Sequence, residues 1–153
     1  MMKFGLYEVD FITQERKLRS GSHAFVKLVN QPGADKRGYT VSVGEIAPDL
    51  LLEYTDGLKV RLSELRGRIV VLQFTASWCS VCIQEMPHLE KDVWQRFKNN
   101  GLVLIGIDRD EPLEVVKEFQ KKVGTTYPLA LDPGAKHFSK FAQMHSIKNL
   151  EFY

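Results

Sequence analysis

The fold of this chain is decided by residues 69–82, which read IVVLQFTASWCSVC. The first part, Ile69–Phe74, is short, rich in β-branched side chains and nearly all apolar, which predicts a strand buried on both faces. The apolar residues that follow recur every three or four positions, as on one face of a helix that ends at Gly101: Cys82, Met86, Leu89, Val93 and Phe97. Two cysteines, Cys79 and Cys82, therefore stand where a buried strand passes into an amphipathic helix.

The spacing of the two cysteines suits a redox-active dithiol. We expect Cys79 in the turn or at the first helical position, with Cys82 one turn further along. Residues three apart on a helix have Cβ atoms about 5–6 Å apart, and a modest adjustment brings them to the roughly 3.5–4.5 Å of a disulfide. Free N–H groups at the helix start favour the Cys79 thiolate as nucleophile. Cys82, on the apolar stripe, is predicted to be buried and neutral, and to resolve the mixed disulfide.

Three other interpretations of the cysteine pair fit the sequence less well. Free cysteines are often core residues, but Cys79 lies beside Trp78 and Ser80 at a loop–helix junction. A structural zinc site needs four ligands, and the sequence has neither a second CxxC nor histidines at ligand spacing, so we predict no metal site. A peroxidatic cysteine usually follows the pattern P-x-x-x-[TS]-x-x-C, where this chain has Leu72 and Ala76. The dithiol interpretation is favoured.

Upstream of this segment the sequence predicts a β-hairpin and one helical turn. The apolar runs Leu50–Tyr54 and Leu58–Leu62 flank Asp56-Gly57, a strong hairpin signal. Residues 63–67 are predicted to form a single helical turn that is capped by Ser63 and stopped by Gly67.

Downstream, strands and helices alternate. We expect a buried strand over Leu102–Ile107, an amphipathic helix that begins at Pro112, an apolar run over Tyr127–Leu131 and a short helix from Ala135 to Ala142. Alternating strands and helices predict a right-handed βαβ crossover with parallel central strands. The predicted fold class is α/β.

The composition is typical of a soluble globular domain. The chain has 153 residues, of which 44% are hydrophobic and 26% charged, enough for one domain and a short appendage. A formal net charge of +2 gives no basic field that would attract nucleic acid. No apolar run reaches the roughly 20 residues that span a bilayer. Residues 1–40 are predicted to be a leader of unknown role without the apolar core of a signal peptide, followed by one domain over 41–153.

Between Gly44 and Ala142 the chain carries an ordered series of motifs. They are Gly44-x-x-Ala47-Pro48-Asp49, Asp56-Gly57, Leu62-Ser63-Glu64-Leu65-Arg66-Gly67, Phe74-x-x-x-Trp78-Cys79-x-x-Cys82, Glu85-x-Pro87, Gly106-Ile107-Asp108 and Tyr127-Pro128. Together they resemble the thioredoxin superfamily, in particular its TlpA/ResA-like thiol–disulfide oxidoreductases of the redoxin type. The resemblance implies a thioredoxin-like fold and exchange of the dithiol with protein disulfides, without a metal or organic cofactor.

The same resemblance implies a role for each residue near the cysteines. Cys79 would be the exposed nucleophile and Cys82 the resolving thiol. Trp78 would be the aromatic residue that lines the substrate side of the site. Pro87 would be the proline that kinks the helix five residues after the second cysteine.

Two polar residues are further candidates. Glu85 matches an acidic position of the TlpA/ResA-like group that is thought to assist proton transfer, although a solvated helix charge is the commonest role of a glutamate. Gln73 stands where classical thioredoxins carry a buried Asp, which would leave more of the proton transfer to Glu85. Charges elsewhere, including those of residues 108–111, are expected to lie on the surface.

The resemblance continues beyond the end of this sequence. A loop with a cis-proline, a two-stranded hairpin and a closing helix would follow Ala142 in the family, so we expect the chain to be truncated. The missing hairpin would pair with the strand at Ile69–Phe74, whose free edge would be an aggregation hazard. Residues 24–29 or 146–153 could cover it instead.

Two main functional hypotheses follow, and a third, weaker one is capture of a metal ion by the exposed dithiol in an oligomer. The first is a bacterial enzyme that exchanges its CxxC dithiol with disulfides of partner proteins and with a reductase or oxidase that resets it. The second is a truncated or degenerate thioredoxin-like module that binds a partner protein without turnover. The family resemblance implies a location in the periplasm or cell envelope, whereas the lack of a signal peptide leaves the cytoplasm open.

Overall fold

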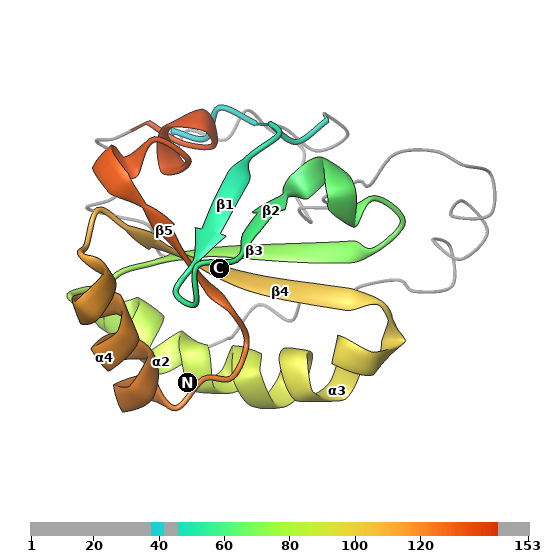
Figure 1. Cartoon of the computed structure of the whole chain (residues 1–153). Helices are drawn as coiled ribbons and strands as arrows, with labels where there is room; N and C mark the ends of the chain where they lie inside the picture. Colours follow the sequence, from blue (N-terminus) through green and yellow to red (C-terminus); the bar gives the residue numbers. More distant parts are fainter. Residues whose placement is uncertain (1–37, 42–45, 144–153) are drawn as a thin grey trace.

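The computed structural model describes residues 38–41 and 46–143 (Figure 1). The strands are β1 (Leu51–Tyr54), β2 (Lys59–Arg61), β3 (Ile69–Thr75), β4 (Leu102–Arg109) and β5 (Leu129–Asp132). The α-helices are α2 (Ser80–His88), α3 (Gln95–Phe97) and α4 (Leu113–Val123). A π-helical segment, η2 (Leu89–Trp94), joins α2 to α3, and short 3₁₀ turns complete the fold: η1 (Leu62–Leu65), η3 (Lys98–Asn100), η4 (Pro133–Ala135) and η5 (Phe138–Lys140). None of the described helices is long and apolar enough to cross a membrane.

The strands form one mixed sheet in the order β2-β1-β5-β4-β3. β4 runs parallel to both of its neighbours, β3 and β5, while β1 is antiparallel to β2 and to β5. The predicted hairpin and the predicted parallel central strands are therefore confirmed. Figure 1 shows α2, α3 and α4 along one face of this sheet.

The register of β3 on β4 places two polar side chains at one end of the sheet. Ile69 pairs with Leu102 at the start of the ladder, and Thr75 pairs with Asp108 at its end. Because parallel strands end at the same edge, the turn that leaves β3 and the turn that leaves β4 lie next to each other. In open α/β sheets this carboxyl edge is where reactive groups collect.

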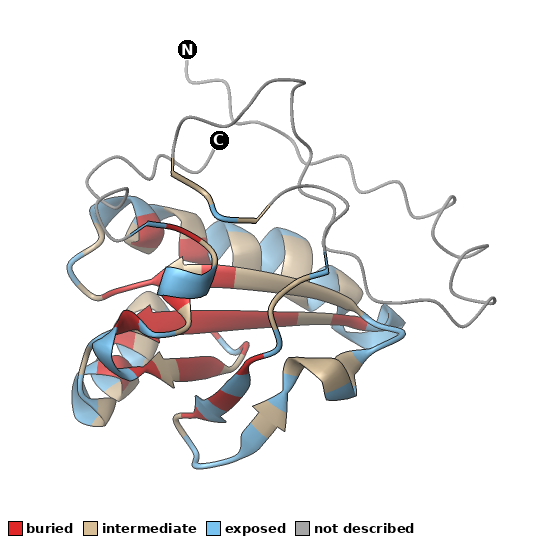
Figure 2. Ribbon diagram, turned by 90° about the horizontal axis from the view of Figure 1, so that it is seen from above, coloured by how far each residue is buried: buried red, intermediate tan, exposed pale blue. Residues whose placement is uncertain are grey.

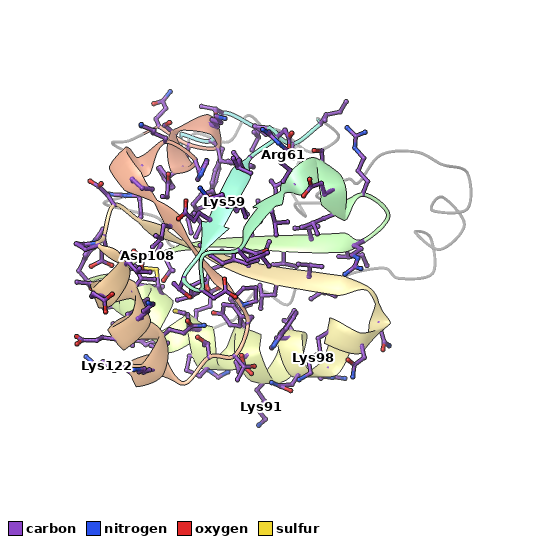
Figure 3. The ribbon with its side chains drawn as sticks, in the orientation of Figure 1. Lys59, Arg61, Lys91, Lys98, Asp108 and Lys122 are labelled. Atoms are coloured by element: carbon purple, nitrogen blue, oxygen red, sulfur yellow. A yellow bond between two sulfur atoms is a disulfide. The ribbon has the colours of Figure 1, made fainter. Side chains whose placement is uncertain are left out.

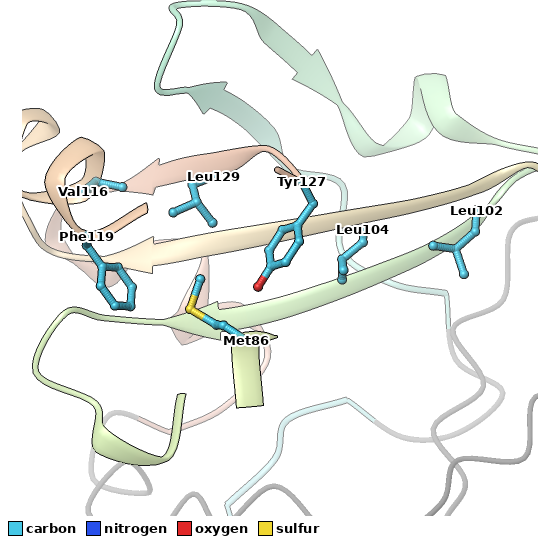
Figure 4. Packing of buried hydrophobic residues seen from close by; sticks show 7 residues of the cluster. All are labelled: Met86, Leu102, Leu104, Val116, Phe119, Tyr127 and Leu129. Carbon is cyan, nitrogen blue, oxygen red and sulfur yellow. The ribbon is translucent and has the colours of Figure 1, made fainter. Parts of the chain in front are cut away.

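Two apolar clusters cover the two faces of the sheet. The cluster on the helical face contains the residues shown in Figure 4: Met86, Leu102, Leu104, Val116, Phe119, Tyr127 and Leu129. The cluster on the opposite face contains Leu50, Leu52, Tyr54, Ile105, Ile107 and Ala130. Figure 2 shows the buried residues concentrated in the central strands, while the helices are exposed on their outer sides. Burial on both faces explains the nearly continuous apolar run of β4.

Three local predictions need correction. Ser63 does not cap the first helical turn: its N–H and hydroxyl donate to Asp49, and the turn begins at Leu62. The long helix after Cys82 is interrupted, because Pro87 lacks the N–H that would bond the preceding turn, and the π-helical segment begins two residues later. The short helix expected at 135–142 is two 3₁₀ turns, since Ala135 has a φ of 52° that a helix cannot continue.

β3 is the edge strand of the described sheet. It stands last in the strand order, and its ladder partner among the described strands is β4. Phe74 on this strand packs against the rings of Phe138 and Phe141, which cover one of its faces. The segments predicted to cover its edge, residues 24–29 and 146–153, lie outside the described residues, as does most of the predicted leader. The domain boundary at residue 40 stays a prediction.

Candidate active site

The two cysteines form a disulfide at the start of α2. Their Sγ atoms are bonded at 2.07 Å, and their Cα atoms lie 5.2 Å apart. Cys79 is the N-cap residue of the helix: it has an extended backbone, and its Sγ accepts the N–H of Cys82 at 3.3 Å. The sulfur thus occupies the position in which side-chain oxygens usually satisfy the free N–H groups of a helix start. A thiolate formed at Cys79 would be stabilised by the same N–H group and by the positive end of the helix.

The two sulfur-bearing residues differ in their exposure. Cys79 is half-buried, whereas Cys82 is only 3% exposed and belongs to the buried face of α2 together with Met86. Sγ of Cys82 lies 3.9 Å from the backbone carbonyl oxygen of Phe74, at the end of β3. A substrate sulfur approaching from solvent therefore reaches Cys79 more easily than Cys82.

The tryptophan before the first cysteine is largely exposed. Trp78 is 57% exposed, and the guanidinium of Arg109 lies 5.2 Å from the centre of its ring. The same guanidinium lies 5.2 Å from the ring centre of Phe138, so that Arg109 is held between two aromatic rings. Burial lowers the pKa of Arg109, and the negative charges of Asp110 and Asp132 oppose this effect. The indole beside Cys79 therefore has a cationic neighbour on its ring face.

The turn before the cysteines is held by a carboxylate from the neighbouring loop. Oε2 of Glu111 accepts the N–H of Ser77 at 2.6 Å, and Oε1 accepts the Ser77 hydroxyl at 2.5 Å. Glu111 is half-buried, which strengthens these charge-assisted bonds relative to a fully solvated pair. The last residue of β4 and the loop after it therefore contact the residues just before Cys79: Arg109 lies against Trp78, and Glu111 bonds Ser77.

Asp108, which precedes this loop, is buried rather than exposed. It is 0% exposed, and neither of its carboxyl oxygens has a hydrogen-bond partner within the described part of the chain. Burial first, and then the negative charge of Glu111, raises the pKa of Asp108 to about 8. Figure 3 shows it at the end of the sheet where α4 begins. A carboxyl group with this pKa is mostly protonated at pH 7.

The expectation that residues 108–111 are surface charges was wrong for most of the segment. Asp108 is buried, Arg109 lies between two rings, and Glu111 holds Ser77; only Asp110 is exposed, and its carboxylate accepts the N–H of Gly134 at 2.7 Å. The alternation of side chains along β4 could have predicted that Asp108 is buried, because residue 108 lies on the same face of the strand as residues 102, 104 and 106. The charged composition of the segment concealed this pattern.

The remaining predicted residues lie behind the disulfide. Glu85, one turn after Cys82 on α2, is half-buried, and its Oε2 accepts the side-chain N–H of Gln73 at 3.3 Å. Burial raises the pKa of Glu85, while the hydrogen bond from Gln73 and the nearby His88 lower it in part. Gln73 is itself buried, and its Oε1 accepts the hydroxyl of Tyr127 at 2.8 Å. The structure thus brings Glu85 and Gln73 together and adds Tyr127, which the sequence analysis did not propose.

Pro87 lies apart from this chemistry. Pro87 is exposed on α2, two residues before the π-helical segment begins. Across residues 38–41 and 46–143, no three His, Cys, Asp or Glu side chains come close enough together to hold a metal ion. The described site therefore consists of two sulfur atoms, a carboxyl group behind them and an aromatic residue beside them.

Comparisons with known proteins agree with this geometry. Thiol-disulfide oxidoreductase ResA of Bacillus thuringiensis is 34% identical to the chain over 103 residues, which are 67% of this chain and 58% of that protein. The ResA protein of Bacillus subtilis is 33% identical over 93 residues, 61% of this chain and 51% of that protein. The chain thus spans a little over half the length of the curated relatives it matches.

Solved structures share both the fold and part of the sequence. A solution structure from Bacteroides thetaiotaomicron, described as a candidate protein disulfide isomerase, is 60% identical with a TM-score of 0.67, covering 69% of this chain and 67% of that chain. A crystal structure of a candidate thiol:disulfide interchange protein DsbE from Chlorobium tepidum is 30% identical with a TM-score of 0.54, covering 60% and 63%. The family profile described as AhpC/TSA family matches residues 43–150. The chain belongs to the AhpC/TSA family and is a ResA-like member of the thioredoxin superfamily.

Proposed function

We propose that this chain is a thiol–disulfide oxidoreductase that exchanges its Cys79–Cys82 pair with disulfides of partner proteins. One observation carries the proposal: the disulfide joins a half-buried helix N-cap sulfur to a buried sulfur one turn further along, at the carboxyl edge of the sheet. That arrangement separates a sulfur that can be attacked from one that is protected. The ResA relatives, named as thiol–disulfide oxidoreductases, support the same activity.

In the reducing direction, Cys79 acts first. Its thiolate attacks one sulfur of a substrate disulfide, forms a mixed disulfide, and releases the other substrate sulfur as a thiolate. The N–H of Cys82 and the helix start stabilise the attacking thiolate. Trp78, exposed beside Cys79, supplies the aromatic surface on which the substrate segment rests.

Cys82 then resolves the mixed disulfide. Its thiol gives its proton to the Glu85 carboxylate, and the resulting thiolate attacks Cys79 and displaces the second substrate sulfur. Residues three apart on a helix have Cβ atoms about 5–6 Å apart, so Glu85 is the carboxylate within reach on α2. Two electrons pass to the substrate, whose two released thiolates each take up a proton. The same steps in reverse oxidise a substrate dithiol.

Reduction of insulin by the chain, with dithiothreitol as electron donor, tests the activity. We expect the wild-type chain to accelerate insulin precipitation, and both Cys79→Ala and Cys82→Ala to lose this turnover. Wild-type protein that has been reduced and alkylated is the matched control, because it keeps every residue but blocks both sulfur atoms. Equal rates for all four proteins would contradict the proposal and favour a partner-binding module without turnover.

We propose the cell envelope as the location, where disulfide exchange has substrates. The family resemblance to TlpA/ResA-like proteins supports this assignment. Cell fractionation of the natural host with an antibody to the chain tests it. Recovery with the envelope fraction is the expected result, and recovery with the cytoplasmic fraction alone would contradict the proposal.

A further inference from the structure

A chain of hydrogen bonds leads from the buried Tyr127 to the half-buried carboxyl group behind the cysteines. The Tyr127 hydroxyl donates to Oε1 of Gln73 at 2.8 Å, and Nε2 of Gln73 donates to Oε2 of Glu85 at 3.3 Å. Figure 4 shows this hydroxyl pointing from the helical-face cluster toward β3, the strand that carries Gln73. Three segments that lie far apart in the sequence thus meet in one polar chain.

The orientation of the Gln73 amide in the structure sets the direction of this chain. An amide oxygen can only accept a hydrogen bond, so the Tyr127 hydroxyl must be the donor to Gln73. Once Oε1 of Gln73 faces the tyrosine, its NH₂ group must face the other way, toward Glu85. Burial raises the pKa of Tyr127 far above its ordinary value, so the hydroxyl keeps its proton at every working pH.

The tyrosine is held in place by its surroundings. It is 0% exposed, and the side-chain amide of Gln120 donates to its backbone carbonyl at 3.0 Å. Gly106 on β4 leaves room for the ring: a Cβ atom there would lie 3.4 Å from Cε2 of Tyr127 and would collide with Leu129. The hydroxyl therefore has little freedom to leave Gln73.

We propose that Tyr127 is a positioning residue for disulfide exchange, because its hydroxyl orients the Gln73 amide as a donor and thereby keeps the Glu85 carboxylate ready to accept the Cys82 proton. The inference rests on the proposed role of Glu85. Tyr127 does not contact the sulfur atoms in this account; it acts on Glu85 through Gln73. Without the hydroxyl, the amide can turn and present its oxygen to Glu85, which favours the protonated acid.

The groups that act on Glu85 set the direction of the expected change. Burial raises its pKa, while Gln73 from β3 and His88 from its own helix lower it. Glu90 also acts on the network, since Glu90 and Glu85 each raise the pKa of Tyr127. Without the hydrogen bond from Gln73, less remains to offset the effect of burial, so the pKa of Glu85 must rise.

Titration of the Glu85 carboxyl carbon by NMR, in the full chain, tests the proposal. In Tyr127→Phe we expect the acid dissociation constant of Glu85 to fall roughly threefold, the size of a modest hydrogen-bond effect. Tyr54→Phe is the matched control: it removes a phenol hydroxyl from the opposite face of the sheet and should leave Glu85 unchanged. An unchanged Glu85 titration in folded Tyr127→Phe would overturn the proposal.

A double variant tests the route through Gln73. In Gln73→Leu the Glu85 pKa should already be raised, and adding Tyr127→Phe should change it no further. If Tyr127→Phe shifts Glu85 equally in both backgrounds, the hydroxyl does not act through Gln73 and the proposal is wrong. Should Tyr127→Phe fail to fold, Gln73→Leu alone decides, because an unchanged Glu85 there would exclude the same route.

Rate measurements separate this inference from the proposed function. In Tyr127→Phe, the pH below which disulfide exchange slows should move upward with the Glu85 titration. A wild-type chain that exchanges no disulfides would remove the proposed function, whatever the titration shows. An active wild-type chain with a pH profile identical to that of Tyr127→Phe would remove only the role of Tyr127.

Discussion

The two sulfur atoms of the site lie in contrasting surroundings. Cys79 is half-buried beside an outer region, the segments 77–78 and 109–111, where an exposed indole, a guanidinium and a carboxylate hold the turn in place. Cys82 is buried beside an inner region, defined by Gln73, Glu85 and Tyr127, where hydrogen bonds join two buried side chains to the half-buried Glu85.

This contrast divides the work of disulfide exchange. The outer region keeps the attacking sulfur accessible and oriented, and its contacts are partly exposed, so each one contributes modestly. The inner region accepts the proton of Cys82. Its hydrogen bonds are buried or partly buried, so the loss of one hydrogen bond changes the pKa of a neighbouring group. Variants of the two regions should therefore differ in what they change. Outer-region variants should change substrate binding and the order of the cysteine turn, and inner-region variants should change the pH dependence of the rate.

The largest effect is expected from Glu85→Gln in the inner region. The carboxylate must be ionised to accept the Cys82 proton, so the resolution rate should fall as the pH drops through a Glu85 pKa that burial holds above its ordinary 4.5. Glu85→Gln should slow resolution about 100-fold and abolish this acid limb. Single-turnover release of a peptide from its mixed disulfide measures the rate.

A matched control for this variant is Glu114→Gln, which removes an acid from α4 whose side chain is 83% exposed. It should leave both the rate and the pH profile unchanged. An acid limb that persists in Glu85→Gln would show that another group accepts the proton.

The next largest effect concerns stability and Asp108, which is buried beneath the outer region yet neutral. Its pKa is about 8 in the folded chain against an ordinary 3.8, so between these pH values the folded chain holds a proton that the unfolded chain has lost. Its contribution to stability is therefore fully present below pH 4 and is lost as the pH rises toward 8. Asp108→Asn should be more stable than wild type at pH 8 by at least about 2 kcal/mol, and by less at pH 5. Urea unfolding at both pH values measures this.

Asp132→Asn separates this effect from the general removal of a buried acid. Asp132 is 1% exposed, but its two oxygens accept the N–H groups of His137 and Phe138 at 2.7 and 2.9 Å. Its replacement should destabilise the chain at both pH values. If Asp108→Asn does the same, the buried acid is ionised and the assignment of a neutral group is wrong.

A smaller effect is expected from Glu111→Ala in the outer region. The variant removes both acceptors of Ser77 and should loosen the turn before Cys79, with a loss of about tenfold in kcat/KM for insulin reduction. Amide hydrogen exchange at residues 77–79 should accelerate in parallel. Ser77→Ala, which removes only the hydrogen bond of the hydroxyl, should give an intermediate loss. A rate equal to wild type in Glu111→Ala would show that the hydrogen bonds from Ser77 to Glu111 are not needed to order the turn.

The smallest effect is expected from Arg109→Gln. The variant removes the cation from between the Trp78 and Phe138 rings, an interaction that contributes about 0.5–1 kcal/mol at exposed sites. We expect KM for a peptide substrate to rise roughly threefold with little change in kcat. The fluorescence anisotropy of Trp78 should decay faster, because its indole becomes more mobile. Arg68 is an exposed arginine between η1 and β3, and Arg68→Gln should change neither KM nor the anisotropy decay. An unchanged anisotropy decay in Arg109→Gln would contradict the idea that Arg109 restricts the motion of the Trp78 indole.

The sequence predicted the sheet and the cysteine turn because their signals are local. Two-sided burial leaves a continuous apolar run in β3 and β4, and the spacing of Cys79 and Cys82 places both on one helix turn. The helix expected at 135–142 failed for a local reason as well: Gly134 and Ala135 have φ values of 68° and 52°, which the helical pattern did not reveal.

The rest of the site depends on contacts between distant segments. Tyr127 bonds Gln73 across 54 positions, and Glu111 bonds Ser77 across 34, so no pattern within one element could reveal either pair. Asp108 was concealed by its charged neighbours, although its place in the alternation of β4 pointed inward. The residues that tune the reaction were therefore harder to find than the residues that perform it.

The division of work between the two sulfur atoms is tested most directly by trapping the mixed disulfide. Reduced Cys82→Ala and reduced Cys79→Ala are each mixed with a disulfide-linked peptide, and the adducts are followed by mass spectrometry. We predict rapid accumulation of an adduct at Cys79 in the first variant, and formation at Cys82 that is roughly 100-fold slower in the second. Equal rates in the two variants, or faster reaction at Cys82, would contradict the account.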